Sequence, residues 1–464
     1  MSINHKSSHS QWSSKVGFLM AAVGSAVGLG SIWKFPYMTG DSGGSAFVII
    51  FIISIALIGF PVLVSEWLIG RRGQSNPAAS FRKIAVANNT TPAWGLLGAF
   101  GILAAFMILS FYSVIGGWSL NYTVKAGIGA FSGMNADATG KMFEGMLANP
   151  MEMALWHTAF MGLTAFIVAG GVSAGIEKAS KIMMPSLALI LLLIVGYNAV
   201  NMDFARGAEF LFNFNLARMQ EVGVSKVLMA ALGHAFFCLS LGMAIMVSYG
   251  SYLKQDVDLM ATARTVIIWD IIFSLAAGLA IFPILFSNNL DPAGGPGLIF
   301  VTLPIAFGQM SFGVVVGTLF FLLLTFAALT SSISILEPIV EFLEEKTPLS
   351  RKMSTLVGAL ATWAVGILAL LSFNELKDFA VFTITMSGEE KPQGIFDALD
   401  YISSKIMLPL IGLGTIILIG WFVNQQTIKQ ELGMSDTAWM VWQAVVKFIA
   451  PLGIIAVFLT ELLG

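Results

Sequence analysis

The chain has 464 residues, of which 57% are hydrophobic and only 11% are charged, and its formal net charge is −2. A soluble domain carries about a quarter charged residues, so this composition excludes an ordinary soluble protein and indicates a chain surrounded by lipid. The near-neutral charge excludes the basic surface typical of nucleic-acid binding, and the single cysteine, Cys238, excludes an intrachain disulfide.

Runs of apolar residues recur along the whole chain, and each is long enough to cross the hydrocarbon core of a bilayer as a helix, which takes about 20 residues. They predict an all-α integral membrane protein with eleven transmembrane helices. The predicted spans are 16–38, 46–70, 91–124, 155–172, 182–200, 226–254, 260–287, 314–344, 352–372, 397–424 and 437–462.

Lysine and arginine gather in alternate loops, for example in 71–83, 178–181 and 346–352. Basic residues stay on the cytoplasmic side of a membrane, so we expect the segment 1–15 to be cytoplasmic and the C-terminus to be outside. The loop at 201–225 then lies outside, and the protein is predicted to be a multi-pass protein of the cell membrane.

The first span contains the stretch "AVGSAVGLGSIWKFP" (22–36), which holds Gly24, Gly28 and Gly30. Each glycine weakens a helix by about 1 kcal/mol relative to alanine, so the helix is expected to break here. Close helix packing through small residues is the alternative, because Gly24 and Gly28 fit that spacing. Irregular backbone survives in a membrane only where it is buried in protein or lines a wet cavity.

The sixth span is interrupted in a similar way, by Cys238, Ser240 and Gly242 in "HAFFCLSLGMAIMVSYGSY" (234–252). Interrupted spans at corresponding places of two halves indicate the midplane site of a secondary transporter. We therefore expect an inverted 5+5 repeat, 16–200 and 226–424, with broken helices one and six. The segment 425–464 would add a loop and the eleventh helix.

Three motifs together carry a family resemblance: "GSAVGLGSIWKFP" (24–36), "FFCLSLGMA" (236–244) and "FAALTSSISILEP" (326–338). With these motifs the chain resembles the neurotransmitter:sodium symporter family, and most of all its bacterial amino-acid transporters with the leucine-transporter-type fold. The resemblance extends from about residue 12 to the tenth span. It implies a symporter that binds Na⁺ and a small amino acid and works by alternating access, while the oligomeric state stays open.

The substrate site follows from the helix break and the resemblance. A half-helix presents free N–H groups and the positive end of its dipole, here near Leu29 and Gly30, which suits a carboxylate. The resemblance adds the hydroxyl of Tyr112 to this carboxylate site; outside the family context, Tyr112 could simply be a polar-tipped aromatic residue in a helix bundle. It places the substrate's amino group against the carbonyls of Ala26, Phe237 and Ser240.

The resemblance also predicts an apolar pocket for the substrate side chain, formed by Ile108, Phe237, Met243, Ser331 and Ile335. In relatives that carry amines without a carboxylate, an aspartate stands where this chain has Gly28. A zwitterionic, neutral amino acid is therefore expected. A methylene group is worth only about 1–3 kcal/mol in such a pocket, so the sequence does not name the amino acid.

The family's second sodium site is matched by the carbonyls of Gly24, Val27 and Ala327 and the hydroxyls of Thr330 and Ser331. Adjacent hydroxyl residues in a membrane helix can also simply bond back to their own helix.

The first sodium site departs from the family pattern. Its predicted members are Ala26, Ser31, Cys238 and Asp270, where relatives have asparagine, threonine and asparagine at the last three. Sulfur is a poor ligand for a hard cation, whereas Asp270 adds a full charge. The site could be rebuilt around Asp270, lost, or protonated in the absence of a cation. Relatives that depend on chloride need an extra anion near this place, whereas those that do not carry a nearby acid on the seventh span. The resemblance therefore implies, with Asp270 as that acid, transport that does not depend on chloride.

Other functions stay open at this point. Cys238, His234 and Asp270 could form the nucleophile constellation of an intramembrane enzyme. A channel, a proton-linked transporter or a homologue that does not transport are further alternatives.

Residues of both gates are also suggested by the resemblance. Lys34 and Asp400, with Phe237 beneath them, would form the outer gate. Trp12 and Glu345 resemble elements of the inner gate, where His9 or Lys6 would pair with Glu345. Glu66 is expected to accept hydrogen bonds from the N–H groups freed at the helix breaks.

Overall fold

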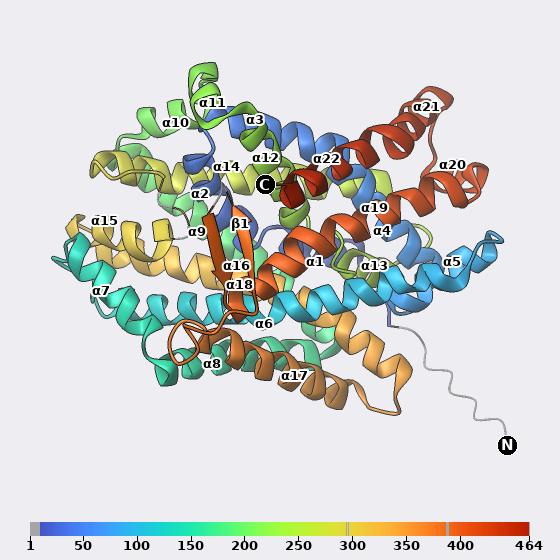
Figure 1. Cartoon of the computed structure of the whole chain (residues 1–464), viewed down its shortest axis with the longest axis horizontal. Helices are drawn as coiled ribbons and strands as arrows, with labels where there is room; N and C mark the ends of the chain where they lie inside the picture. The colour runs from blue at the N-terminus through green and yellow to red at the C-terminus, as the bar shows by residue number, and fades with distance from the viewer. Residues whose placement is uncertain (1–9, 294, 296, 387–388, 464) are drawn as a thin grey trace.

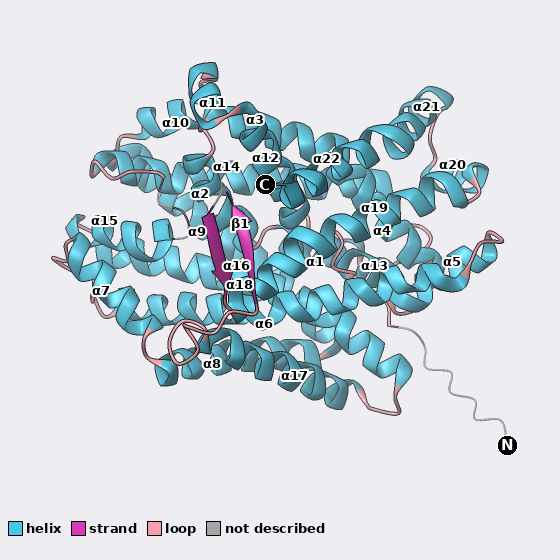
Figure 2. Cartoon of the chain, viewed as in Figure 1, coloured by secondary structure: helices cyan, strands magenta, loops and turns pink. Residues whose placement is uncertain are grey.

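The structure is a computed structural model, and it describes residues 10–293, 295, 297–386 and 389–463. Helices account for most of this part of the chain (Figure 2). Within it, nine helical segments are long and apolar enough to cross a membrane, and the total is eleven when two bent pairs are each taken as one span. The fold class predicted from the sequence, an all-α membrane protein with eleven spans, is confirmed.

The first half of the chain begins with a span that is broken in its middle. The helices and helical turns in this half are α1 (Lys15–Ala26), η1 (Gly30–Lys34), α2 (Phe35–Asp41), α3 (Ser45–Ser54), η2 (Ile55–Gly59), α4 (Phe60–Gly73), α5 (Pro77–Ala87), η3 (Pro92–Trp94), α6 (Gly95–Gly127), α7 (Ala136–Leu147), α8 (Pro150–Ala169), η4 (Val172–Glu177), α9 (Lys178–Asn201), α10 (Phe204–Phe212) and α11 (Leu216–Val222).

The second half adds one short antiparallel hairpin to its helices. Its elements are α12 (Val224–Cys238), α13 (Ile245–Ser251), α14 (Leu259–Ser287), η5 (Leu298–Thr302), α15 (Leu303–Gln309), α16 (Gly313–Lys346), α17 (Arg351–Leu371), β1 (Phe382–Met386), β2 (Glu389–Gln393), α18 (Ile395–Asp400), η6 (Tyr401–Met407), α19 (Leu408–Ile417), η7 (Leu418–Phe422), α20 (Gln425–Leu432), α21 (Asp436–Ala444), η8 (Val445–Ile449) and α22 (Ala450–Leu463).

The first span breaks where its glycines lie. Helix α1 ends at Ala26, Val27 leaves the helical conformation with ψ at 74°, and the helix resumes at Gly30 in a π-helical turn. The two halves are bent by 43°. Pro36 is the second residue of α2, which directly follows this π-helical turn. The predicted break is therefore present.

The sixth span breaks over a longer stretch. Six residues, 239–244, separate α12 from α13, and Ser240, Gly242 and Ala244 all have positive φ angles, of 54°, 75° and 60°. A Cβ atom at Gly242 would also lie 2.6 Å from the carbonyl oxygen of Leu408, so only glycine fits there.

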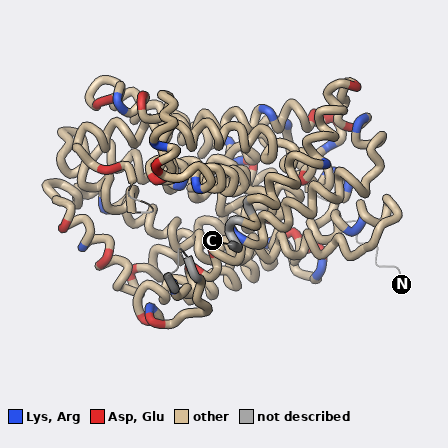
Figure 3. The backbone as a smooth tube through the Cα atoms, turned by 45° about the horizontal axis from the view of Figure 1, so that its top comes forward, with Lys and Arg blue, Asp and Glu red and all other residues tan. Residues whose placement is uncertain are grey.

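The broken spans lie inside the molecule, against long unbroken helices. Helices α6 and α16 pack along each other, and α1 contacts α16, α9 and α14. In Figure 1 the long helices run roughly horizontally, with α7, α10 and α15 at the left end and α5, α20 and α21 at the right. Figure 3 shows most charged residues toward the two ends of the molecule and a middle part with few of them, as a lipid environment requires.

Two features differ from the predicted elements. The fifth span begins at Val172 instead of about 182, because Glu177, Lys178 and Lys181 continue the helix at its polar end. The polar connection at 373–396 contains the hairpin β1–β2, in which Phe382 pairs with Gln393.

Candidate transport site

Three groups from three spans meet at the break in the first span. The backbone N–H of Leu29 donates to the Tyr112 hydroxyl of α6 at 3.3 Å. A Cβ atom at Gly28 would lie 2.0 Å from the Ser331 hydroxyl oxygen of α16 and 3.3 Å from that of Tyr112. The geometry thus brings two of the predicted carboxylate donors, the Leu29 N–H and the Tyr112 hydroxyl, together with the Ser331 hydroxyl around a position that carries no side chain.

The carbonyl groups predicted to hold the substrate's amino group lie at the turns of both breaks. The Ala26 carbonyl accepts from Gly28 N at 3.0 Å and from the Ser31 hydroxyl at 3.3 Å. The Phe237 carbonyl accepts from Ser240 N at 3.2 Å. A carbonyl oxygen has two lone pairs, so an ammonium group bound at Ala26 would replace one of the two donors that this carbonyl has here, for example the Ser31 hydroxyl.

Ser25 joins the two breaks to α16. Its carbonyl accepts from the hydroxyls of Ser240 at 2.9 Å and Ser331 at 3.3 Å, and its own hydroxyl donates to Ser334 at 2.8 Å. Sequence reasoning missed Ser25 and Ser334. The available signal was spacing, since Ser334 follows Ser331 by one helical turn, on the same face of α16.

The residues predicted for the second sodium site are also brought together. A Cβ atom at Gly24 would lie 3.3 Å from Thr330 Cβ, which places the end of α1 against α16. The Thr330 hydroxyl donates to the carbonyls of Phe326 at 3.1 Å and Ala327 at 3.0 Å, both in its own helix. Such bonding within the helix is the alternative to a role in binding sodium. All the predicted ligand atoms of this site are carbonyl or hydroxyl oxygens, and oxygen is the ligand that a hard cation prefers.

The altered first site contains a buried acid. The Ser31 hydroxyl donates to Asp270 Oδ1 at 2.7 Å, and Cys238 Sγ lies 3.9 Å from Ser31 Oγ and 3.1 Å from His234 Nε2. Asp270 Oδ2 and the hydroxyl of Ser274, one turn later, are buried without a hydrogen-bond partner among the described residues. Asp270 Oδ1 therefore lies against Ser31, next to the break in the first span.

Glu66 supports the break in the sixth span. Its Oε1 atom accepts from the backbone N–H of Gly242 at 2.8 Å. The expected contact between this acid and a freed N–H group is present.

A cavity of about 330 Å³ opens above this site, on the side of the molecule that we call the Lys34 side. Tyr112, Phe237, Lys34 and Asp400 line it, and Lys34 Nζ lies 4.2 Å from the centre of the Phe237 ring. The remaining predicted pocket residues are buried and do not line this cavity; they are Ile108, Met243, Ser331 and Ile335.

The opposite side, which we call the Trp12 side, is closed by polar and aromatic contacts. Trp12 is 4% exposed; its ring N–H donates to the Tyr249 carbonyl at 3.0 Å and its backbone N–H to the Tyr252 carbonyl at 3.3 Å. Glu345 accepts from Asn76 N at 2.9 Å. The predicted partners of Glu345, His9 and Lys6, lie outside the described residues.

A surface ion pair ties the start of α1 to the loop after α13 on this side. Lys15 Nζ lies 3.0 Å from an Asp256 carboxylate oxygen, and it lowers the pKa of that exposed carboxyl below its ordinary value. Because both groups are in contact with solvent, this pair contributes little to stability.

Comparison with known proteins identifies the family. The model of the sodium:neurotransmitter symporter family matches residues 9–131 and 143–463. The chain belongs to this family. It is similar to the uncharacterized sodium-dependent transporter YhdH of Bacillus subtilis (strain 168), with 38% identity over 97% of both chains, and to an uncharacterized sodium-dependent transporter of Haemophilus influenzae, with 32% identity over the whole of both.

A solved relative shows the same fold. The crystal structure of MhsT in complex with L-phenylalanine matches with a TM-score of 0.87 and 40% identity, over 97% of this chain and 99% of that one. The chain is thus a multi-pass, sodium-dependent symporter and not an enzyme. The alternative of a catalytic Cys238, His234 and Asp270 was wrong in function, although the structure does place the first two side by side.

Proposed function

We propose that this symporter carries a neutral, hydrophobic amino acid together with Na⁺ and does not require chloride. The observation that carries the proposal is the meeting of Leu29 N, the Tyr112 hydroxyl and Ser331 at Gly28. Main-chain donors at a helix break bind a carboxylate without an arginine.

The substrate class is inferred from what surrounds this point. Ile108, Met243 and Ile335 are buried and uncharged, and Gly28 supplies no acid to replace a missing substrate carboxylate. The similarity to MhsT, which was solved with L-phenylalanine, supports a hydrophobic side chain. The substrate's ammonium group would be bound by the carbonyls of Ala26, Phe237 and Ser240.

Coupling is inferred from where the second sodium site would lie. Its proposed ligands are the carbonyls of Gly24, Val27 and Ala327 and the hydroxyls of Thr330 and Ser331, so it joins α1 to α16. An ion shifts a conformational equilibrium only by binding one state better than the other. Sodium would do so here by holding together two groups of spans, 1, 2, 6 and 7 against 3, 4, 8 and 9, that rock relative to each other.

This motion would expose the site to each side of the membrane in turn. We take the Trp12 side as cytoplasmic, on the basis of the basic loops in the sequence. Lys34, Asp400 and Phe237 would close the outer path over the substrate. Trp12 and Glu345 belong to the closure of the inner path.

Chloride independence is inferred from Asp270. Asp270 is buried beside Ser31, and its Oδ2 atom has no hydrogen-bond partner among the described residues. In our proposal the carboxylate completes the first cation site and makes an external anion unnecessary, because a charge in the membrane interior needs an opposite charge nearby.

The test is uptake of radiolabelled L-phenylalanine into proteoliposomes, with sodium, proton and chloride gradients imposed separately. We expect uptake that follows the sodium gradient, is unchanged when chloride is replaced by gluconate, and is inhibited by other hydrophobic amino acids. Uptake driven by a proton gradient in the absence of sodium would overturn sodium coupling. Loss of uptake without chloride would overturn the role of Asp270. If the protein takes up charged amino acids with sodium but no hydrophobic ones, the proposed substrate class is overturned.

A further inference from the structure

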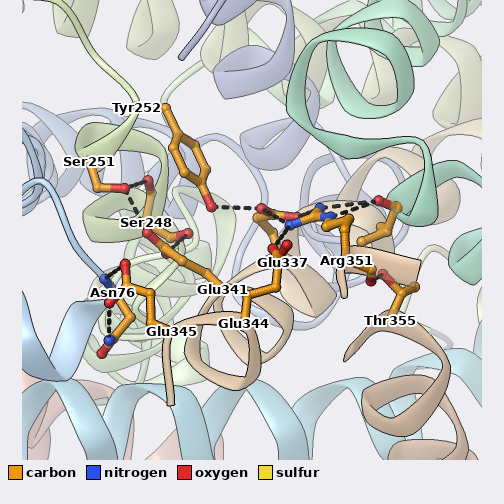
Figure 4. A network of polar contacts seen from close by, with 11 residues as sticks. Asn76, Ser248, Ser251, Tyr252, Glu337, Glu341, Glu344, Glu345, Arg351 and Thr355 are labelled. Carbon is orange, nitrogen blue, oxygen red and sulfur yellow. Dashed lines mark hydrogen bonds and ion pairs between the residues drawn. The ribbon is translucent and has the colours of Figure 1, made fainter. Parts of the chain in front are cut away.

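Three acidic residues lie on one face of α16 toward the Trp12 side: Glu337, Glu341 and Glu345. They are spaced by four residues, so successive members are one helical turn apart. Figure 4 shows their carboxylates in one polar network with residues from other elements. Two of the three, Glu337 and Glu341, are buried.

The contacts of this network fall into two kinds. Arg351 of α17 pairs with Glu337 and also with Glu344 at 3.0 Å, and it donates to the carbonyl of Val168 at the end of α8. All these partners belong to spans four, eight and nine, which stay together in the proposed motion. Such contacts hold the network in place but do not join the two rocking groups.

Other contacts cross between the groups. The Tyr252 hydroxyl, from the segment after α13, donates to Glu337 at 2.7 Å. Glu341 is 3% exposed and accepts from two hydroxyls of α13, Ser248 at 2.5 Å and Ser251 at 2.8 Å, one on each carboxylate oxygen. Helix α13 is the inner half of the broken sixth span, and α16 is the eighth span. The Glu341 carboxylate therefore connects the moving half-helix to the stationary helix at two points.

We propose that Glu341, Ser248 and Ser251 form a lock that holds the inner half of the sixth span against the eighth span in the inward-closed form. The inference rests on the rocking motion proposed above. A carboxylate that accepts from two hydroxyls on one helix face separates from that helix only after both hydrogen bonds have broken. Glu341 is thus a positioning residue: it contacts neither substrate nor ion but sets the balance between the two forms.

The chemistry of this contact makes the lock reversible. Hydroxyl bonds to a carboxylate are charge-assisted and strong in a water-poor site. When the inner path opens, water reaches the same carboxylate and replaces both hydroxyls, so the free acid does not stay unsolvated. A pair of apolar side chains at this place would gain nothing from the entry of water and would resist opening.

The motion can be measured directly by the distance between two spin labels. Lys254, after α13, and Lys352, at the start of α17, are exposed on the two sides of the lock, and the native Cys238 is only 1% exposed. Both lysines are replaced by cysteine in the full chain, which is labelled in lipid nanodiscs with saturating sodium and no amino acid. The distance distribution then reports the inner opening without a transport assay.

We expect Glu341→Ala to raise the population of the longer, inward-open distance about tenfold or more, since each lost bond to a charged group has a large effect. Ser248→Ala should give a smaller rise. Adding Ser248→Ala and Ser251→Ala to Glu341→Ala should change nothing further, because the contact is already gone. The matched control is Glu344→Gln, which removes a carboxylate from the same helix but breaks only a contact to Arg351; its distribution should equal that of the unaltered lock.

The variant that carries both Ser248→Ala and Ser251→Ala, with Glu341 retained, should give the same rise as Glu341→Ala. The proposal is overturned if either of these two variants is folded and has the distance distribution of Glu344→Gln. If Glu341→Ala does not fold, the serine variants decide by the same criterion. Because no amino acid is added, the result holds even if uptake reveals another substrate. The labelled chain without further substitutions is also measured with and without sodium. If its distance distribution does not change with sodium, the rocking motion itself is overturned, together with the lock.

Discussion

The groups that we propose to bind the substrate are arranged around Gly28, and packing leaves no room for a side chain at this position. Gly28→Ala would place a Cβ atom 2.0 Å from the Ser331 hydroxyl. Overpacking typically costs about 1–3 kcal/mol, so we expect uptake to fall roughly tenfold or more, with a higher KM for the amino acid. The control is Gly196→Ala in α9, where an added Cβ meets nothing within 4 Å. Equal uptake by the two variants would contradict the assignment.

Cys238 tests whether a cation binds at the altered first site. Cys238→Thr replaces sulfur by an oxygen, the ligand that a hard cation prefers, beside Ser31 and near Asp270. We expect the sodium concentration for half-maximal uptake to fall severalfold. Cys238→Val has the same shape as threonine without the oxygen and should give no such gain. A similar shift in both variants would mean that packing, and not ligation, determines the effect.

The residues of the site were predictable in unequal measure. Gly28, Tyr112 and Thr330 stood out because they lie in motifs whose spacing has a chemical meaning. Ser25 and Glu341 did not, since a serine in a membrane helix most often bonds back to its own helix and an acid near a helix end is usually solvated. Their hydrogen-bond partners are 90 or more residues away in the chain, and a local sequence pattern does not reveal such contacts.

At the scale of the element, the two helix breaks need acceptors and donors from other spans to persist in the membrane. Glu66 supplies one, through its bond to Gly242 N in the break of the sixth span. Glu66→Ala leaves this buried N–H unsatisfied, and a bond to a charged group is worth about 1.5–3 kcal/mol. We therefore expect a lower melting temperature and little uptake. Glu66→Gln retains an acceptor oxygen, so it should keep most of the melting temperature and most of the uptake. If Glu66→Gln lowers both as much as Glu66→Ala does, the charge of Glu66 itself is needed.

Element boundaries were predicted well where apolar runs end in loops and poorly where polar residues continue a helix. The first span was expected at 16–38 and extends over Lys15–Asp41. The fifth was predicted about ten residues short, because Glu177 makes the helix look terminated. In the structure Glu177 accepts from Ser13 N at 2.8 Å and from Lys181 at 2.6 Å, so its burial at the helix start is compensated. The hairpin β1–β2 was not predicted, because only β1 shows the alternation of apolar and polar side chains that indicates a strand, and β2 does not.

At the scale of the whole molecule, the two sides of the site differ. On the Lys34 side a cavity reaches Tyr112 and Phe237, whereas on the Trp12 side α13 is tied to α16 and to the segment before α1. The described chain therefore has the form expected of a transporter open to one side only. Sodium between α1 and α16 would favour this form, so contacts that exist only on the closed side should change sodium affinity from a distance.

Trp12 is the clearest case of such a contact. Its ring lies 5.1 Å from that of Tyr249 and 5.7 Å from that of Phe18, and truncation of a buried tryptophan costs about 3–5 kcal/mol. Because this loss falls on the form that is closed on the Trp12 side, Trp12→Ala should raise the sodium concentration needed for thermal stabilisation about tenfold or more, measured by the melting temperature across a sodium titration. Trp421→Ala, at a ring that is 55% exposed, removes the same side chain without touching the closure and should leave the sodium midpoint unchanged. If both variants shift the midpoint equally, the closure on the Trp12 side is not coupled to sodium binding.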